Sequence, residues 1–280
     1  MILVLDTSKH NGIIDVGQAK SQGVSAIAGR CTVGNYYCDR LDTDKMGENF
    51  ARLWDNCKQE EMPVSAYNVI MPAYTDGGKD RISADEHLDW FFTWFANRQP
   101  DFPIIWDCEK SRYQTYDWIT AVIQGCVKGT KGFGGFDYPI IYTRQNWWDA
   151  YVKPWSEWHK CPLWLAWYPY KNGVPSSFYV DFPPTNIRPW LPRDWKEANK
   201  DFSAWQYSAD GNGQGARFGA RSKAIDLSMG LESIFLGEPV IVPPVIPPIE
   251  PPVGIEPYIA DINISNNLGT WAGSVELEKV

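Results

Sequence analysis

Eight short apolar runs recur along the first 227 residues, and segments with helical periodicity separate most of them in the first half of the chain. A short apolar run is typical of a buried strand, and a strand–helix–strand order implies parallel pairing because a parallel connection needs a long crossover. Eight such strands close a β/α barrel. The sequence therefore predicts an α/β fold, a (β/α)8-like barrel. The runs span residues 1–6, 25–30, 63–69, 103–109, 138–143, 162–168, 202–207 and 223–227.

The helical segments differ between the two halves of the chain. In the first half, a helix is expected after Ser83, which forms a capping-box spacing with Glu86, and another over residues 113–128. After residue 143 the only helical signals are short, at 144–152 and 193–199. The barrel is thus expected to be irregular, with hairpin-like connections between its last strands. An earlier amphipathic helix is indicated by Met46, Phe50, Leu53, Trp54 and Cys57.

The C-terminal part of the chain has a different composition. Residues 238–257 are dense in proline, which favours an extended spacer over helix or central strand. Residues 258–280 alternate apolar and polar side chains around a turn, as a β-hairpin does. A lone hairpin is marginally stable, so we expect it to dock, to mediate self-association or to belong to a larger module. The predicted organisation is a catalytic barrel over 1–237, a linker and this hairpin.

Composition excludes several classes of partner. The formal net charge of -8 argues against nucleic acid, whose binding depends on Lys and Arg neutralising phosphates. No stretch approaches the roughly 20 apolar residues of a membrane helix, so membrane insertion is not expected. The N-terminal residues 1–5 lack the basic region of a signal peptide.

Six cysteines, at positions 31, 38, 57, 108, 126 and 161, show no metal-ligand spacing. Several lie inside apolar runs, which favours free buried thiols over disulfides. No metal and no cofactor are predicted.

Polar side chains cluster at the ends of the predicted strands. In parallel barrels the active site lies at the carboxyl ends of the strands. The fourth run ends in Asp107 and Glu109, and their i, i+2 spacing places both on one face. Four acids, an arginine and several aromatics are therefore expected on one rim. The other runs end at Asp6, Arg30, Tyr67, Tyr142, Trp164 to Tyr168, Trp205 with Gln206, and Asp226.

Such a rim suits hydrolysis of glycosides, which needs one protonated carboxyl as acid and one anionic carboxyl beside it. Crowded carboxylates repel one another, and burial among aromatics also disfavours charge, so one pKa in the cluster is expected to be raised. Glu109, longer and nearest the strand end, is the predicted general acid. Asp107, Asp6 and Asp226 are its predicted anionic partners.

Structural interpretations compete with these functional ones. Asp15 precedes a helix and is most simply its cap. Arg30 is better explained as a counter-ion of the acidic rim than as a substrate contact. Trp164 and Trp205 belong either to the core or, if their faces open into the cleft, to platforms for sugar rings. A Ser-His-Asp hydrolase lacks its base, because His10, His87 and His159 are scattered.

At these residues the chain resembles the lysozymes of glycoside hydrolase family 25, found in bacteria, fungi and phages. The similarity covers most of residues 1–237. It begins at the segment Asp6-Thr7-Ser8 and includes the D-x-E strand of Asp107 and Glu109. Later segments resemble family motifs in the same order, at residues 140–143, 163–168, 205–207 and 225–227.

The resemblance implies an irregular β/α barrel that hydrolyses the β-1,4 bond between N-acetylmuramic acid and N-acetylglucosamine in peptidoglycan. It implies that Glu109 is the acid/base and that Asp107 assists the reacting centre. Asp6 and Asp226 would complete the acidic cluster, with Tyr67 and Tyr142 lining the site; Tyr168, Trp164, Trp205, Gln206 and Arg30 are further candidate contacts. One departure is Asn68, where many members have histidine after the tyrosine, which leaves cleft polarity or substrate preference open.

Two mechanisms and three functions remain open at this point. Either the substrate's 2-acetamido group attacks the anomeric carbon, steadied by Asp107, or a carboxylate activates water and the configuration inverts. The favoured function is a lysozyme acting on the bacterial cell wall, as a phage endolysin released from the host cytoplasm or as a secreted enzyme whose signal was removed. The alternatives are a non-catalytic wall-binding or virion structural protein, and a chitinase or N-acetylglucosaminidase.

Overall fold

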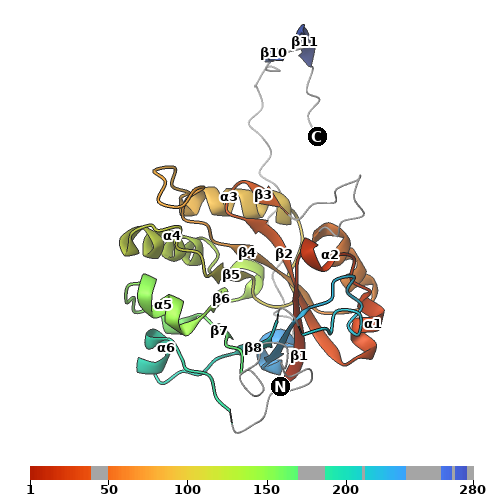
Figure 1. Cartoon of the computed structure of the whole chain (residues 1–280), viewed down its shortest axis with the longest axis vertical. Helices are drawn as coiled ribbons and strands as arrows, with labels where there is room; N and C mark the ends of the chain where they lie inside the picture. The colour runs from red at the N-terminus through yellow and green to blue at the C-terminus, as the bar shows by residue number, and fades with distance from the viewer. Residues whose placement is uncertain (39–49, 170–186, 210–211, 238–259, 267–268, 276–280) are drawn as a thin grey trace. The chain divides into compact units, whose positions relative to one another are not determined.

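The computed structural model describes residues 1–38, 50–169, 187–209, 212–237, 260–266 and 269–275 (Figure 1). Eight strands form a closed barrel, in the order β1-β9-β8-β7-β6-β5-β4-β2, and β1 pairs with β2 to close it. The predicted α/β barrel is confirmed. The strands are β1 (Ile2–Thr7), β2 (Val24–Val33), β4 (Val64–Val69), β5 (Ile105–Cys108), β6 (Ile140–Thr143), β7 (Leu163–Ala166), β8 (Ala204–Ser208) and β9 (Asp226–Gly230), and β3 (Tyr37–Cys38) pairs with the end of β2.

Helices surround the barrel (Figure 1), and those after α4 are short. The helix α4 has 14 residues, whereas α5 and α6 have 7 and 5. The irregular second half expected from the sequence is therefore present. The helices are α1 (Val16–Ser21), α2 (Phe50–Gln59), α3 (Ala84–Phe95), α4 (Tyr116–Gly129), α5 (Gln145–Tyr151), α6 (Arg193–Glu197) and α7 (Glu232–Phe235), with 3-10 turns at Lys9–Asn11, Phe133–Gly135 and Trp158–Lys160.

Local capping explains where the longer helices begin. Ser83 accepts a hydrogen bond from the amide of Glu86, and the Glu86 carboxylate accepts one from the amide of Ser83, which completes the predicted capping box before α3. Asp15 accepts a hydrogen bond from the amide of Gln18 at 2.8 Å and caps α1, as its structural interpretation predicted. Met46, the first residue of the expected helix around α2, lies outside the described residues.

The last barrel strand runs opposite to the others. Pairing is parallel from β1 through β2 and around to β8, but β9 is antiparallel to both β8 and β1. The prediction that residues 223–227 form a strand ending at Asp226 is wrong, because β9 begins at Asp226. The reversal still leaves Asp226 at the rim where the parallel strands end. The expected hairpin-like connection between the last strands is the β8–β9 connection.

Side chains of alternate residues divide the core into two layers. Odd residues of β1, such as Leu3 and Leu5, pack outward in the large core shared with the helices. The smaller inner core is apolar and includes Phe102 against Phe235, with ring centroids 4.9 Å apart. Its buried members are Ile2, Val4, Ala26, Ala28, Phe102, Ile105, Ile140, Trp164, Ala204 and Phe235. The side chains that alternate toward the inside of the barrel continue along the strands to the rim. There they include Asp6, Arg30, Asp107, Tyr142 and Gln206.

All six cysteines are buried, and among the described residues none forms a disulfide bond. Among the helices that the structure describes, none has the length and apolar character to cross a bilayer. The C-terminal unit contains an antiparallel hairpin, β10 (Ala260–Asn266) and β11 (Gly269–Val275), with Asn266 opposite Gly269. The predicted linker over 238–257 lies outside the described residues.

Candidate active site

A cavity of about 510 Å³ lies at the rim formed by the carboxyl ends of the parallel strands. The four predicted acids, Asp6, Asp107, Glu109 and Asp226, all line it. Five other predicted site residues line it as well: Arg30, Tyr67, Tyr142, Trp164 and Tyr168. The barrel thus brings together residues from seven different strand ends, and only Trp205 and Gln206 of the predicted set are absent from the cavity wall.

Asp6 and Asp226 form a pair at the seam between the first and last strands. They are direct partners in the β1–β9 register, and their side chains are hydrogen-bonded to each other. Asp6 also accepts a hydrogen bond from Gln206 Nε2 at 2.7 Å. Burial raises the pKa of Asp6 to about 6; the hydrogen bonds from Gln206 and Asp226 oppose this shift, and the charge of Glu109 adds to it. A hydrogen bond between two carboxyl groups requires that one of them carries a proton.

Asp107 lies deeper than its strand neighbour Glu109. It is 8% exposed, and within the described part of the chain its Oδ1 is buried without a hydrogen-bond partner. Burial, followed by the negative charge of Glu109, holds the pKa of Asp107 well above its usual range, although the positive charges of Lys110 and Arg30 oppose this shift. Burial thus disfavours the charged form of Asp107, and the positive charge of Arg30 opposes this effect, as expected of the counter-ion that the sequence suggested.

Glu109 is the accessible carboxyl of the pair. Its side chain is 18% exposed and lies between two cations, with Lys110 Nζ 2.9 Å from Oε1 and Arg144 Nη2 3.3 Å from Oε2. The sequence analysis missed both cations. Arg144 follows Tyr142 by two residues and so continues the inward row of β6, which is the signal that pointed to it. A ligand in the cavity can reach Glu109 and the two cations together.

A buried glutamine links three of the rim residues. The hydroxyls of Tyr142 and Tyr168 both donate to Gln206 Oε1, the former at 2.9 Å, while Gln206 Nε2 donates to Asp6. Burial raises the pKa of Tyr142 well above its usual range, so its hydroxyl keeps the proton that it donates. Gln206 is buried and does not line the cavity. It fixes the positions of residues that do.

The two candidate tryptophans occupy different layers. Trp164 lies inside the barrel, where its Nε1 donates to Ser228 Oγ at 3.0 Å, and it forms part of the cavity wall. Trp205 lies in the outer core, and its Nε1 donates to the carbonyl of Trp167 at 2.6 Å. The position of Trp205 agrees with the structural interpretation of this residue, not with a sugar platform.

Asn68, the departure from the family pattern, is fully buried and points away from the cavity. Its Nδ2 donates to Thr32 Oγ1 and lies 3.4 Å from the carbonyl of Gly34. The neighbouring Tyr67 lines the cavity. The asparagine at position 68 therefore affects the contact between β4 and β2, and it is not part of the cavity lining.

The three histidines have separate surroundings. His10 lines the cavity, His87 is buried, and His159 lies beside a different surface hollow. His87 accepts a hydrogen bond from the amide of Met71 through Nε2 at 3.0 Å, and its Nδ1 lies 2.7 Å from the carbonyl of Ser83. Across the described residues, no group of three or more His, Cys, Asp or Glu side chains is arranged to hold a metal ion.

These features define what the cavity can do chemically. It combines buried carboxyls whose pKa values are raised with an accessible carboxyl and two tyrosine hydroxyls. Proton donation to a leaving oxygen and stabilisation of a developing positive charge require these groups, and both steps occur in glycosidic bond cleavage.

Several solved structures have the same fold as this chain. Among solved structures, the chain is similar to a bacterial lysozyme from Streptomyces coelicolor, with 20% identity and a TM-score of 0.61 over 82% of this chain and 91% of that one. A muramidase from Acremonium alcalophilum has 17% identity and a TM-score of 0.59 over 85% and 100%. The catalytic domain of endolysin ply40 from Listeria monocytogenes bacteriophage P40 has 18% identity and a TM-score of 0.53 over 85% and 98%. These likenesses show the fold.

The sequence itself shows the family. No curated protein sequence matches the chain significantly. The family model described as glycosyl hydrolases family 25 matches residues 5–216, which include Asp6, Asp107 and Glu109, while Asp226 lies beyond the match. Because this match spans most of the chain and all but one of the rim acids, the protein belongs to glycosyl hydrolases family 25 and is a glycoside hydrolase.

Proposed function

We propose that the protein is a lysozyme of the muramidase type, which hydrolyses the β-1,4 bond between N-acetylmuramic acid and N-acetylglucosamine in bacterial peptidoglycan. The observation that carries this proposal is the rim cavity lined by all four acids, with Glu109 more accessible than the buried Asp107. Membership of the family supports it, as does the likeness to a lysozyme, a muramidase and a phage endolysin.

In the proposed mechanism Glu109 donates a proton to the glycosidic oxygen as the bond to the anomeric carbon breaks. The carbonyl oxygen of the substrate's 2-acetamido group attacks that carbon from the opposite face and forms a cyclic intermediate. The Glu109 carboxylate then takes a proton from water, which opens the ring and restores the acid. No atom of the protein becomes covalently bound to the sugar.

Asp107 has the role of orienting the acetamido group. Its Oδ1 is a hydrogen-bond acceptor without a partner in the described part of the chain, and a turn of the carboxyl about the Cβ–Cγ bond would present it to the acetamido N–H. As positive charge develops on the acetamido group, it favours the ionised form of Asp107 and is stabilised by it. Inversion by directly activated water is the second mechanism, and the anomeric configuration of the first product, read by NMR, separates the two.

The decisive experiment compares Glu109→Gln with Glu157→Gln, which removes an ion-paired glutamate outside the cavity. We expect Glu109→Gln to abolish the release of new reducing ends from purified peptidoglycan while the protein keeps its melting temperature. Glu157→Gln should remain active. Normal cleavage by Glu109→Gln would contradict the proposal.

Labelling the new reducing ends tests the bond that is cleaved. Muramic acid at the new end supports a muramidase, whereas glucosamine would indicate an N-acetylglucosaminidase or a chitinase-like enzyme. Binding to peptidoglycan without any new reducing ends would support the non-catalytic alternative. We further propose that the enzyme acts on the cell wall as an endolysin, a proposal that the likeness to ply40 supports.

A further inference from the structure

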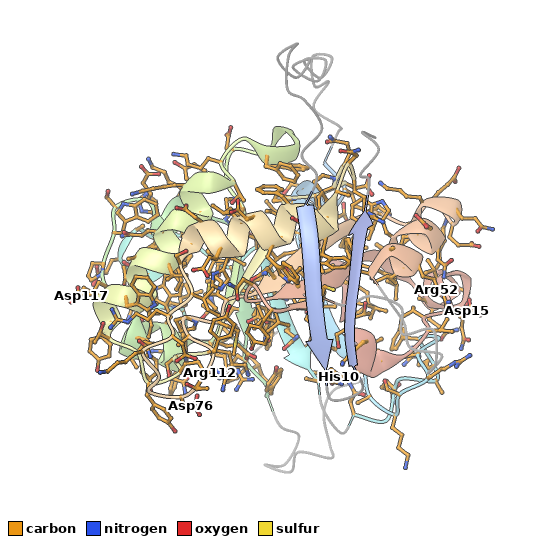
Figure 2. The ribbon with its side chains drawn as sticks, turned by 90° about the horizontal axis from the view of Figure 1, so that it is seen from above. His10, Asp15, Arg52, Asp76, Arg112 and Asp117 are labelled. Carbon is orange, nitrogen blue, oxygen red and sulfur yellow. The ribbon has the colours of Figure 1, made fainter. Side chains whose placement is uncertain are left out.

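One wall of the cavity is built from three loops that meet at Arg112. Arg112 follows β5, and its Nη1 lies 3.1 Å from Asp76 Oδ1 on the loop after β4. Figure 2 labels this pair, Asp76 and Arg112, at neighbouring positions. Arg112 is also hydrogen-bonded to the side chain of Tyr36, from the turn after β2. Arg112 and Tyr36 line the cavity, but Asp76 does not. The guanidinium is therefore fixed at the β2–β4–β5 side of the rim.

The backbone that carries Arg112 is in an unusual conformation. Arg112 and Tyr113 have φ angles of 47° and 51°, so two consecutive non-glycine residues occupy the left-handed region. Such residues are uncommon, and the conformation persists only where surrounding contacts impose it, as often occurs at functional sites. Here the amide of Gly77 donates to the carbonyl of Arg112 at 2.9 Å, and Gln114 Nε2 donates to the carbonyl of Gly78 at 2.9 Å. The strained loop is held in place by its neighbour.

Arg112 has hydrogen-bonding capacity left for a ligand. A guanidinium has five N–H donors, and Asp76 and Tyr36 engage only some of them. Its Nε is buried without a partner among the residues that the structure describes, but the side chain as a whole is 32% exposed and lines the cavity, so a ligand can reach the exposed part of the guanidinium. Its acid partner Asp76 is 55% exposed and faces away from the cavity lining. The carboxylate that is ion-paired with Arg112 is thus itself exposed to solvent.

The other cations of the cavity serve the reacting centre. Lys110 and Arg144 both contact Glu109, and Arg30 acts on the charge of Asp107. Arg112 differs from them because its ion-pair partner is none of the four acids. A cation in a glycan-binding cleft that does not neutralise the catalytic acids is suited to an anionic group of the substrate.

We propose that Arg112 binds a carboxylate of the peptide attached to the glycan, and so gives the enzyme a preference for glycan strands whose peptides are negatively charged. This inference rests on the proposed function. The lactyl group of the muramic acid is in amide linkage to the peptide, and the sugar rings carry no charge, so the carboxylates of a peptide-bearing strand belong to its peptides. A planar guanidinium matches such a group with two parallel hydrogen bonds.

The test uses two soluble tetrasaccharides of alternating N-acetylglucosamine and N-acetylmuramic acid that differ only in their peptides. In one the peptide carboxylates are free, and in the other they are converted to carboxamides. For the full chain we expect a lower KM on the charged substrate. Arg112→Gln should raise that KM by about tenfold, the effect of losing a charge-assisted hydrogen bond, with kcat almost unchanged. The KM of Arg112→Gln on the amidated substrate should rise far less, so the preference for the charged substrate should disappear, and Arg112→Lys should recover part of that preference.

The matched control is Arg188→Gln, which removes another exposed arginine paired with an aspartate, Asp201, outside the cavity. It should alter neither KM. Equal KM values of the unmodified enzyme on the two substrates overturn the inference even if the Arg112 variants do not fold. So does an equal rise in KM on both substrates in Arg112→Gln. Failure of the unmodified enzyme to cleave either substrate overturns the proposed function instead.

Discussion

Asp6 and Asp226 face each other across the seam where the barrel closes, one on the first strand and one on the last, and their carboxyl groups are hydrogen-bonded. The pairing of β1 with β9, which is needed for a closed barrel, therefore also brings two of the four acids together. The pair exists only because β9 is antiparallel to β1, which places its first residue beside the sixth residue of the chain. This arrangement leads to predictions about charge and stability.

Asp6→Asn should stabilise the fold at alkaline pH. The pKa of Asp6 is raised from 3.8 to about 6, so the folded protein binds this proton more tightly than the unfolded chain does. The resulting stabilisation is complete below pH 3.8 and is lost as the pH rises through 6. Asparagine stays neutral at both pH values. The free energy of unfolding of the variant should therefore exceed that of the parent by up to about 3 kcal/mol at pH 8 and equal it near pH 4. Urea unfolding at both pH values measures this.

Asp117→Asn serves as its control, because it removes the same charge from an exposed site on α4. If Asp6→Asn increased the free energy of unfolding by the same amount at pH 4 and pH 8, this would contradict the assignment of a raised pKa to Asp6.

Gln206→Leu should destabilise the barrel and reduce activity together. Leucine fills a similar volume but leaves Asp6, Tyr142 and Tyr168 without their shared partner. Three hydrogen bonds of buried groups are lost, and each contributes about 0.5–1.5 kcal/mol. Denaturant unfolding should show that the free energy of unfolding falls by several kcal/mol. Gln18→Leu, at an exposed glutamine on α1, should lower the free energy of unfolding far less. A variant as stable as the parent would show that the network contributes little.

His87 should remain neutral until the pH falls to about 4. Burial lowers its pKa from 6.5 to about 4, although the hydrogen bond with Ser83 and the charge of Glu86 oppose this shift. The unfolded chain takes up the proton first, so stability is complete above pH 6.5 and declines as the pH falls toward 4. The contribution of His87 should thus lower the free energy of unfolding by about 3 kcal/mol over this pH range. An NMR titration of the imidazole measures the pKa directly, and protonation near pH 6.5 in the folded protein would refute it.

A chain ending at residue 237 should fold and retain catalysis. Residues 1–241 form one compact unit that contains the whole rim cavity, and the hairpin belongs to the other unit. We expect the shortened chain to keep its melting temperature and its kcat on soluble tetrasaccharides. Sedimentation of both chains tests the expected role of the hairpin, because self-association should disappear with residues 238–280. An inactive or aggregated shortened chain would contradict the proposed domain boundary.

The alternation of side chains along strands made most of the site predictable from the sequence. The period of two places Asp107 and Glu109 on one face, and the same rule places Trp205, one residue away from Gln206, in the outer core. The rule gives the side of a strand but not the depth along it. This is why Gln206 was expected to contact substrate and instead lies beneath the tyrosines that line the cavity.

The direction of β9 could not be read from the sequence, because it depends on the connection and an apolar run has the same pattern in either direction. Lys110 and Arg144 were missed because a charged residue just after a strand end most often faces solvent. Lys110 adjoins Glu109 in the chain, and Arg144 continues the inward row of β6, which pairs with β5.

The opposite directions of β8 and β9 also bear on how this enzyme can be altered. The chain leaves β8 after Ser208 and enters β9 at Asp226 on the same side of the barrel, and Ala209 and Ala224 within this connection line the cleft. New sequence grafted between them would be displayed beside the acids that line the cavity, without lengthening any helix-bearing crossover. Surface connections tolerate insertions at small entropic cost. This connection is therefore the place at which a designed recognition loop can be added while the strand register stays intact.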